Sequence, residues 1–169
     1  MTRRMQHGQR GMTLVEMIVT VCIVAVLGSI AIKELREYTR RAAVTEVVLT
    51  LSKCRNTITE NYLAFDSAPA AGTWGCEGAA GNTSRAGLIQ TSSDGVVRIA
   101  IANLDGLVNG RHVYLVPMTA DGTRPMITPT DLGKGVSRWL CGSDWQPVRN
   151  ALPANCRADT TIFATQDFN

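Results

Sequence analysis

The feature that most constrains this chain is an apolar run near its N-terminus, from Met12 to Ile32. The run contains one charged residue, Glu16, and no proline. At about 1.5 Å of rise per residue, a helix of this length is about 30 Å long, which matches the hydrocarbon core of a bilayer. A carboxylate inside such a helix is costly and by default marks a function that involves a partner. The run therefore predicts a membrane-length helix with Glu16 as a candidate functional residue.

Two common classes of N-terminal segment fit this run incompletely. A secretory signal peptide has an apolar stretch of only about 7–15 residues followed by a small-residue cleavage site, whereas this run is longer and continues into charged sequence at Lys33. A simple transmembrane anchor fits the length and the basic flank of Arg3, Arg4 and Arg10, which would stay in the cytoplasm. An anchor accommodates Glu16 only if the carboxylate lies at the membrane interface.

A third class follows from the sequence GMTLVE at residues 11–16, which together with the apolar run resembles the processing site of type IV prepilins. In that family a membrane peptidase cuts after the glycine and methylates the new N-terminus. The resemblance implies a scissile bond between Gly11 and Met12, a leader of residues 1–11, N-methylation of Met12 and a mature chain of residues 12–169. Three positions depart from the family: Met12 replaces the usual phenylalanine, and many members have proline where this chain has Lys33 and glycine where it has Ala25.

Cleavage at this site would create a new ionic group at the start of the helix. The α-amine of Met12 is cationic near neutral pH, and burying it in a fibre of parallel helices is expensive unless it is paired. Glu16 is the only acid in the run and lies about 6 Å along the helix axis from Met12. The sequence therefore predicts that Glu16 pairs with the Met12 amine of a neighbouring copy and sets the register of assembly.

The balance of charge bears on whether the chain binds nucleic acid. The chain has 17 basic and 14 acidic residues. Removal of the leader takes away three arginines and no acid, so the mature chain has 14 of each and no formal net charge. Net charge therefore gives no reason to expect a dedicated nucleic-acid site.

The five cysteines predict disulfides rather than a metal site. Cys22 lies in the apolar run, where a small apolar packing residue is expected. The other four lie in the part predicted to face the periplasm, where disulfides persist, and four cysteines allow three pairings. Proximity in sequence favours Cys54–Cys76 and Cys141–Cys156. There is no C-x-x-C motif and the two histidines are isolated, so we expect no metal and no cofactor.

Beyond the apolar run the chain predicts an α+β domain. Residues 12–32 form the membrane or filament-core helix, and residues 33–63 extend it as an amphipathic helix with apolar residues three or four apart. Residues 64–169 form a globular head. We expect a long helix packed on an antiparallel sheet of three or four strands, the strand candidates being Val96–Ala102, Arg111–Met118, Gly135–Gly142 and a short one at Leu88–Thr91.

The C-terminal region carries a second resemblance to the same family. Trp139-Leu140-Cys141 and the LPANCR sequence at residues 152–157 are similar to the family's cysteine-bounded C-terminal loop. The resemblance implies a Cys141–Cys156 disulfide and a loop that is exposed on the filament, where it contacts surfaces or neighbouring subunits.

The predicted function is structural, because no G-x-S-x-G, H-E-x-x-H or phosphate-binding loop is present. The resemblance implies a type IV pilus subunit that polymerises with itself into an extracellular filament serving adhesion, twitching motility or DNA uptake. It implies a Gram-negative bacterium, storage in the inner membrane with a periplasmic head, and as partners the prepilin peptidase, an assembly platform, ATPases and a secretin. The alternatives are a minor pilin, a type II secretion pseudopilin, and a membrane-tethered periplasmic binding module or enzyme.

Overall fold

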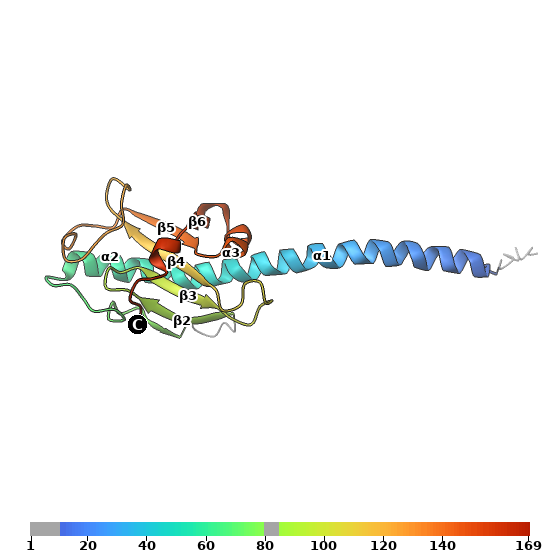
Figure 1. The fold of residues 1–169 in the computed structure, drawn as a ribbon, viewed down its shortest axis with the longest axis horizontal. Helices are drawn as coiled ribbons and strands as arrows, with labels where there is room; N and C mark the ends of the chain where they lie inside the picture. Colours follow the sequence, from blue (N-terminus) through green and yellow to red (C-terminus); the bar gives the residue numbers. More distant parts are fainter. Residues whose placement is uncertain (1–10, 80–84) are drawn as a thin grey trace, which may run out of the picture. The chain divides into compact units, whose positions relative to one another are not determined.

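The computed structural model describes residues 11–79 and 85–169, which form two compact units divided after Glu37. Residues 1–10 of the predicted leader, including its three arginines, lie outside the described residues. The first unit is the N-terminal part of helix α1 (Leu14–Ser52), and the second unit begins at Tyr38 (Figure 1). α1 is helical throughout, including at Gly28 and Lys33.

The predicted long helix is present with a short interruption near its C-terminal end. α1 ends at Ser52 and α2 (Cys54–Ala64) begins two residues later. Between them the Lys53 N–H donates to the carbonyl of Thr50 at 3.3 Å, an i→i−3 bond in place of the usual i→i−4 bond. The hydroxyls of Thr50 and Ser52 also donate to carbonyls one turn earlier. Such side-chain bonds compete with the backbone ladder, which gives a physical reason for the break.

The sheet is larger than the three or four strands expected. Among the described residues it has six strands in sequence order: β1 (Gly78–Ala79), β2 (Ala86–Thr91), β3 (Val97–Ile101), β4 (His112–Met118), β5 (Arg138–Ser143) and β6 (Ala158–Asp159). The predicted meander corresponds to β2–β5 and is antiparallel, as expected. β1 extends it antiparallel at one edge, and β6 pairs parallel with β5 at the other. Both added strands have two residues, too few for an alternating pattern to reveal them.

The main core lies between the helices and one face of the sheet. The helical side is formed by residues spaced three or four apart, and the sheet side by alternate residues of β3 and β4. Nearly all of these side chains are fully buried: Val44, Val47 and Leu51 of α1, Ile58 and Tyr62 of α2, Val97, Ile99 and Ile101 of β3, and Val113 and Leu115 of β4. The predicted α+β architecture, with a long helix on an antiparallel sheet, is confirmed.

The opposite face of the sheet is covered by the C-terminal tail, which the sequence did not predict. Tyr114, Val116 and Met118 of β4 form a second buried cluster with Phe163, which ends the 3₁₀ helix η2 (Thr161–Phe163). The chain end continues this layer, since Thr91 and Asn169 exchange two backbone hydrogen bonds at 3.3 and 3.4 Å. Strand β4 is therefore buried on both faces along nearly its whole length.

We predict that Phe163→Ala destabilises the head by about 3 kcal/mol, because it removes a buried aromatic ring and leaves a cavity between the tail and β4. The neighbouring Ile162 is 75% exposed, so Ile162→Ala is the matched control and is expected to change stability by less than about 0.5 kcal/mol. Urea unfolding of the soluble head measures both. Equal effects of the two substitutions would contradict the second layer.

Candidate functional site

The N-terminal motif lies at the start of α1. Gly11, Met12 and Thr13 are outside the helix, which begins at Leu14. The Oγ1 of Thr13 accepts a hydrogen bond from the N–H of Glu16 at 3.3 Å. Thr13 is thus the N-cap of the helix, and Glu16 lies in its first turn, where an acid is favourable to the helix dipole. Sequence reasoning missed the role of Thr13, although the T-x-x-E pattern of a capping box was a signal for it.

The glycine of the motif is not required by the packing of this chain. A Cβ built on Gly11 would meet nothing within 4 Å. If the function of this segment requires glycine here, the requirement comes from a molecule or residue outside the described chain, such as an enzyme that binds the segment.

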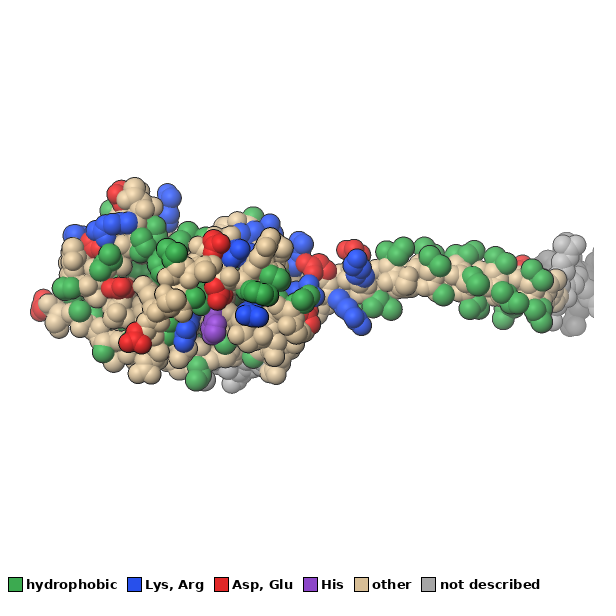
Figure 2. Space-filling model, viewed as in Figure 1, with side chains coloured by type: hydrophobic (Ala, Val, Ile, Leu, Met, Phe, Trp, Pro, Cys, Tyr) green, Lys and Arg blue, Asp and Glu red, His purple; other side chains and the backbone are tan. Residues whose placement is uncertain are grey.

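The first part of α1 is an apolar cylinder exposed on all sides. Its large side chains from Met12 to Leu35 are all at least half exposed, and Figure 2 shows hydrophobic side chains along the visible face of this segment. By length and composition it is the one helix among the described residues that could span a membrane. Cys22 is a free cysteine on this surface. Soluble proteins rarely leave such a large contiguous apolar surface in water, so this surface needs a cover.

The structure describes one chain, so it places Glu16 but not its predicted partner. The Glu16 side chain is exposed on the surface of the apolar segment. Pairing of Glu16 with the Met12 amine of a neighbour, and cleavage between Gly11 and Met12, stay predictions.

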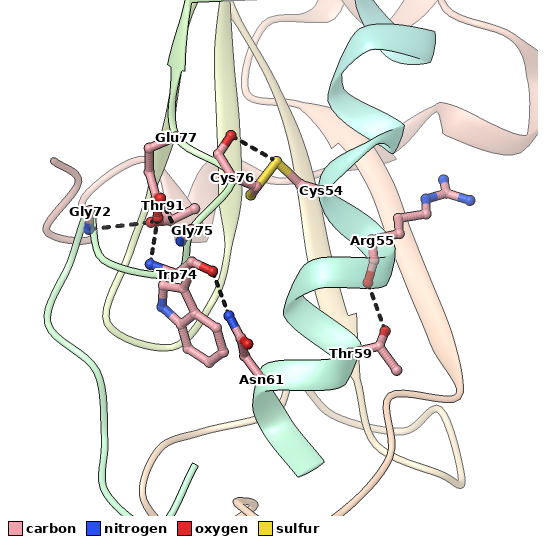
Figure 3. The surroundings of a disulfide bond; sticks show 10 residues. All are labelled: Cys54, Arg55, Thr59, Asn61, Gly72, Trp74, Gly75, Cys76, Glu77 and Thr91. Carbon is pink, nitrogen blue, oxygen red and sulfur yellow. Dashed lines mark hydrogen bonds between the residues drawn. A yellow bond between two sulfur atoms is a disulfide. The ribbon is translucent and has the colours of Figure 1, made fainter. Parts of the chain in front are cut away.

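The first predicted disulfide, Cys54–Cys76, is confirmed and ties residues 65–79 to α2 (Figure 3). The same segment is held by Glu77, whose carboxylate accepts hydrogen bonds from the N–H groups of Trp74 and Gly75 at 2.7 Å and from the hydroxyl of Thr91. Burial alone raises the pKa of Glu77, but these hydrogen bonds together lower it below its ordinary value. No sequence pattern pointed to Glu77, since its role depends on the turn at residues 74–77.

Trp74 completes the attachment of this segment. Its side chain is fully buried, its indole N–H donates to the carbonyl of Ser92 at 2.8 Å, and its ring lies 5.0 Å from that of Tyr62. Burial also raises the pKa of the Tyr62 hydroxyl well above its ordinary value. The stretch around Trp74 is rich in glycine and alanine, which is typical of a loop, yet it carries one of the largest side chains of the core.

The structure also joins Cys141 of β5 to Cys156 at the end of the 3₁₀ helix η1 (Ala154–Cys156). The loop between them contains a half-exposed Trp145 and, directly after it, helix α3 (Gln146–Ala151). The Arg111 guanidinium lies 4.0 Å from the centre of the Trp145 ring, and the indole N–H donates to the carbonyl of Leu107 at 3.1 Å. The cysteine-bounded loop is therefore attached to the connection between β3 and β4.

Among the described residues of the head, one carboxylate is fully buried, that of Asp131, and its oxygen atoms already accept hydrogen bonds. Asp131 accepts two hydrogen bonds from the Arg124 guanidinium at 2.6 and 2.9 Å, one from Lys134 at 2.9 Å and one from the N–H of Ile127 at 3.0 Å. The Arg124 bonds, aided by Lys134 and Ile127, hold the pKa of Asp131 well below its usual range. A carboxylate held in this way remains ionised and stabilises the connection between β4 and β5. It is therefore poorly suited to act as a general acid or base.

Other candidate chemistry in the head is limited. Within residues 11–79 and 85–169 no group of three or more His, Cys, Asp and Glu side chains could hold a metal ion. His112 of β4 is half-buried, and burial together with the nearby Arg98 and Arg111 lowers its pKa. The site with a distinctive arrangement is therefore the N-terminal segment, Gly11 to Glu16, with the apolar helix behind it.

Comparison with known proteins covers both ends of the chain. Residues 40–157 match the family model described as pilin, a bacterial filament protein, and residues 6–32 match the prokaryotic N-terminal methylation motif. A fimbrial protein of Neisseria meningitidis serogroup A is 29% identical over 94% of this chain and 88% of its own length. A type IV major pilin protein of Neisseria gonorrhoeae is 29% identical over 90% and 84%, and a fimbrial protein of Eikenella corrodens is 25% identical over 93% and 96%.

We predict that Asp131→Asn destabilises the head by about 1.5 kcal/mol at pH 7. It weakens the charge-assisted bonds to Arg124 and Lys134, whose exposed positions let water screen part of the effect. Because folding lowers the pKa of Asp131, this stability is present above its unfolded pKa of about 4 and is lost as the pH falls further. The difference between wild type and variant, measured by urea unfolding, should therefore shrink below about pH 4.

The control for this prediction is Asp66→Asn, since Asp66 is exposed. Asp66→Asn should have the same free energy of unfolding as the wild type, both at pH 7 and below about pH 4. A difference between wild type and Asp131→Asn that stays constant down to pH 2.5 would rule out the ionised carboxylate as its source.

Proposed function

Because this chain belongs to the type IV pilin family, we propose that it is processed between Gly11 and Met12, stored in the inner membrane and polymerised through α1 into a pilus. Family membership makes it a structural subunit of an extracellular filament. The proposal adds the route by which it reaches the filament and the residues that act along that route.

The observation that carries this proposal is the exposed apolar surface of α1 between Met12 and Leu35. At about 25 cal/mol per Å² of apolar surface, leaving several such side chains in water costs several kcal/mol. Lipid can cover this surface before assembly, because the helix has the length and hydropathy of a membrane span. Like helices of neighbouring copies can cover it afterwards. Assembly then exchanges one apolar cover for another.

Such an exchange supplies little net hydrophobic driving force, since lipid tails are as apolar as leucine and valine side chains. The proposed ion pair between Glu16 of one copy and the Met12 amine of another supplies direction and register. In this scheme cleavage is a prerequisite for assembly, because the α-amine of Met12 does not exist in the uncut chain.

The proposed partners follow from the family and from the proposed route. They are further copies of this chain, the prepilin peptidase, and the platform, ATPases and secretin of a Gram-negative pilus machine. The filament would serve adhesion, twitching motility or DNA uptake. The exposed residues of the cysteine-bounded loop, among them Trp145, are the part of the head proposed to contact surfaces or neighbouring subunits.

We predict that Glu16→Ala leaves membrane insertion and head folding intact but lowers the yield of sheared filaments at least tenfold, because the buried amine then lacks its partner. Glu34→Ala is the matched control: Glu34 is an exposed acid on the same helix just beyond the apolar run, and its variant should assemble like wild type. Normal filament yield from Glu16→Ala would contradict the pairing.

Mass spectrometry of the filament subunit tests the processing step. The proposal expects a chain that begins at N-methylated Met12. An intact leader on the functional protein would favour the alternative of a membrane-tethered periplasmic module over a filament subunit.

A further inference from the structure

The start of α1 is set by the backbone and side chain of a single residue. The Thr13 carbonyl accepts the N–H of Met17 at 3.2 Å, and Thr13 Oγ1 accepts the N–H of Glu16 at 3.3 Å. These are the two bonds that define an N-cap residue. As a consequence Gly11 and Met12, the two residues of the proposed scissile bond, lie outside the helix.

Without this cap, extension of the helix toward the N-terminus would be energetically favoured. The first N–H groups of a helix have no partner within it, and in an apolar environment each unpaired group is costly. Extension by a turn moves the unpaired groups out of the apolar run and into the polar residues before Gly11. The cap satisfies one of these N–H groups from a side chain and so removes part of the gain from extension.

Hydrolysis, in contrast, needs Gly11 to lie outside the helix. Cleavage adds water across the Gly11–Met12 bond, which leaves a carboxylate on Gly11 and an α-amine on Met12. In a helix the carbonyl to be attacked accepts a hydrogen bond from four residues later and is surrounded by side chains, and proteolytic cutting concentrates in segments outside regular structure.

We propose that Thr13 is a positioning residue for leader removal: by capping α1 immediately after Met12, it keeps the Gly11–Met12 bond non-helical and open to the membrane peptidase. The inference rests on the processing proposed above. Gly11 acts in the same direction, because glycine is a poor helix former and nothing in the described chain contacts the position of its missing Cβ. Thr13 touches the backbone of α1 and not the reacting atoms.

The test compares caps of different shape in the full-length chain. Thr13→Val keeps the shape of threonine and removes the hydroxyl acceptor, Thr13→Ser keeps a hydroxyl, and Thr13→Asn keeps a strong cap with a different shape. Each chain is inserted into membranes that contain the peptidase, and the initial rate of conversion to the chain beginning at Met12 is measured by mass spectrometry. The amount of inserted uncut chain at time zero controls for insertion.

We expect Thr13→Val to be cut about fivefold more slowly than wild type. The Ser and Asn variants should be cut at rates within about twofold of the wild-type rate. Backbone chemical shifts of Gly11 and Met12 in the uncut chain should move toward helical values in the Val variant only. If Thr13→Val acted only by disturbing the shape of the inserted helix, Thr13→Asn, which also changes that shape, would not be cut at the normal rate.

Three results would overturn the inference. Equal rates for wild type and Thr13→Val would show that the cap does not matter, and would leave the proposed function intact. Slow cutting of the Asn variant with normal cutting of the Ser variant would show that the peptidase reads the hydroxyl itself. A wild-type chain that is never cut at Gly11–Met12 would overturn the proposed processing and this inference with it.

Discussion

The rest of this molecule depends on an apolar helix that the chain itself does not cover. Between Met12 and Leu35 the large side chains of α1 point outward on every side, and this part of the chain forms a separate compact unit from the head. A stretch of this kind is unstable in water and needs lipid or other protein around it. The fold of the head, the acid in the apolar run and the motif before it are best understood as solutions to that requirement.

The head uses the C-terminal part of the same helix for a different purpose. From Ala43 onward, α1 and then α2 bury one stripe of side chains against the sheet and expose the other, so this part of the helical sequence is amphipathic. Two further sets of contacts stabilise the head. The Cys54–Cys76 disulfide, Glu77 and Trp74 attach the segment after α2, and the C-terminal tail covers the second face of the sheet.

The sequence predicted those parts of the structure that depend on local pattern. The three-to-four spacing of apolar residues, such as Val44, Val47 and Leu51, predicted the amphipathic helix, and the strand candidate Val96–Ala102 corresponds to β3. Both patterns report on neighbours a few residues away. The helix stop at Lys53 was not predicted, because it depends on hydrogen bonds of Thr50 and Ser52 that compete with the backbone.

What the sequence missed depends on contacts between distant segments or on turn geometry. Burial of Tyr114 and Val116 requires Phe163, which lies far along the chain, so the strand alone gives no sign of a second layer. Trp74 stands among glycines and alanines that are typical of a loop, and its burial follows from contacts with Tyr62 and Ser92. In the N-terminal site the motif identified Glu16, whereas the helix cap that Thr13 forms beside it was not predicted.

On the proposed route Glu16 has two partners, and the one that it meets depends on the proposed cleavage between Gly11 and Met12. In the uncut chain its carboxylate lies in the first turn of α1, where the helix dipole and the Thr13 cap make an acid favourable. After the proposed cleavage a cationic amine would stand at Met12, and a charged group competes more strongly for a carboxylate than a backbone dipole does once water is excluded. The acid would thus lie at a stable helix start while the chain is stored in the membrane, and would become an assembly contact once the leader is removed. This order needs no rearrangement of α1, because the same residue at the same position serves both states.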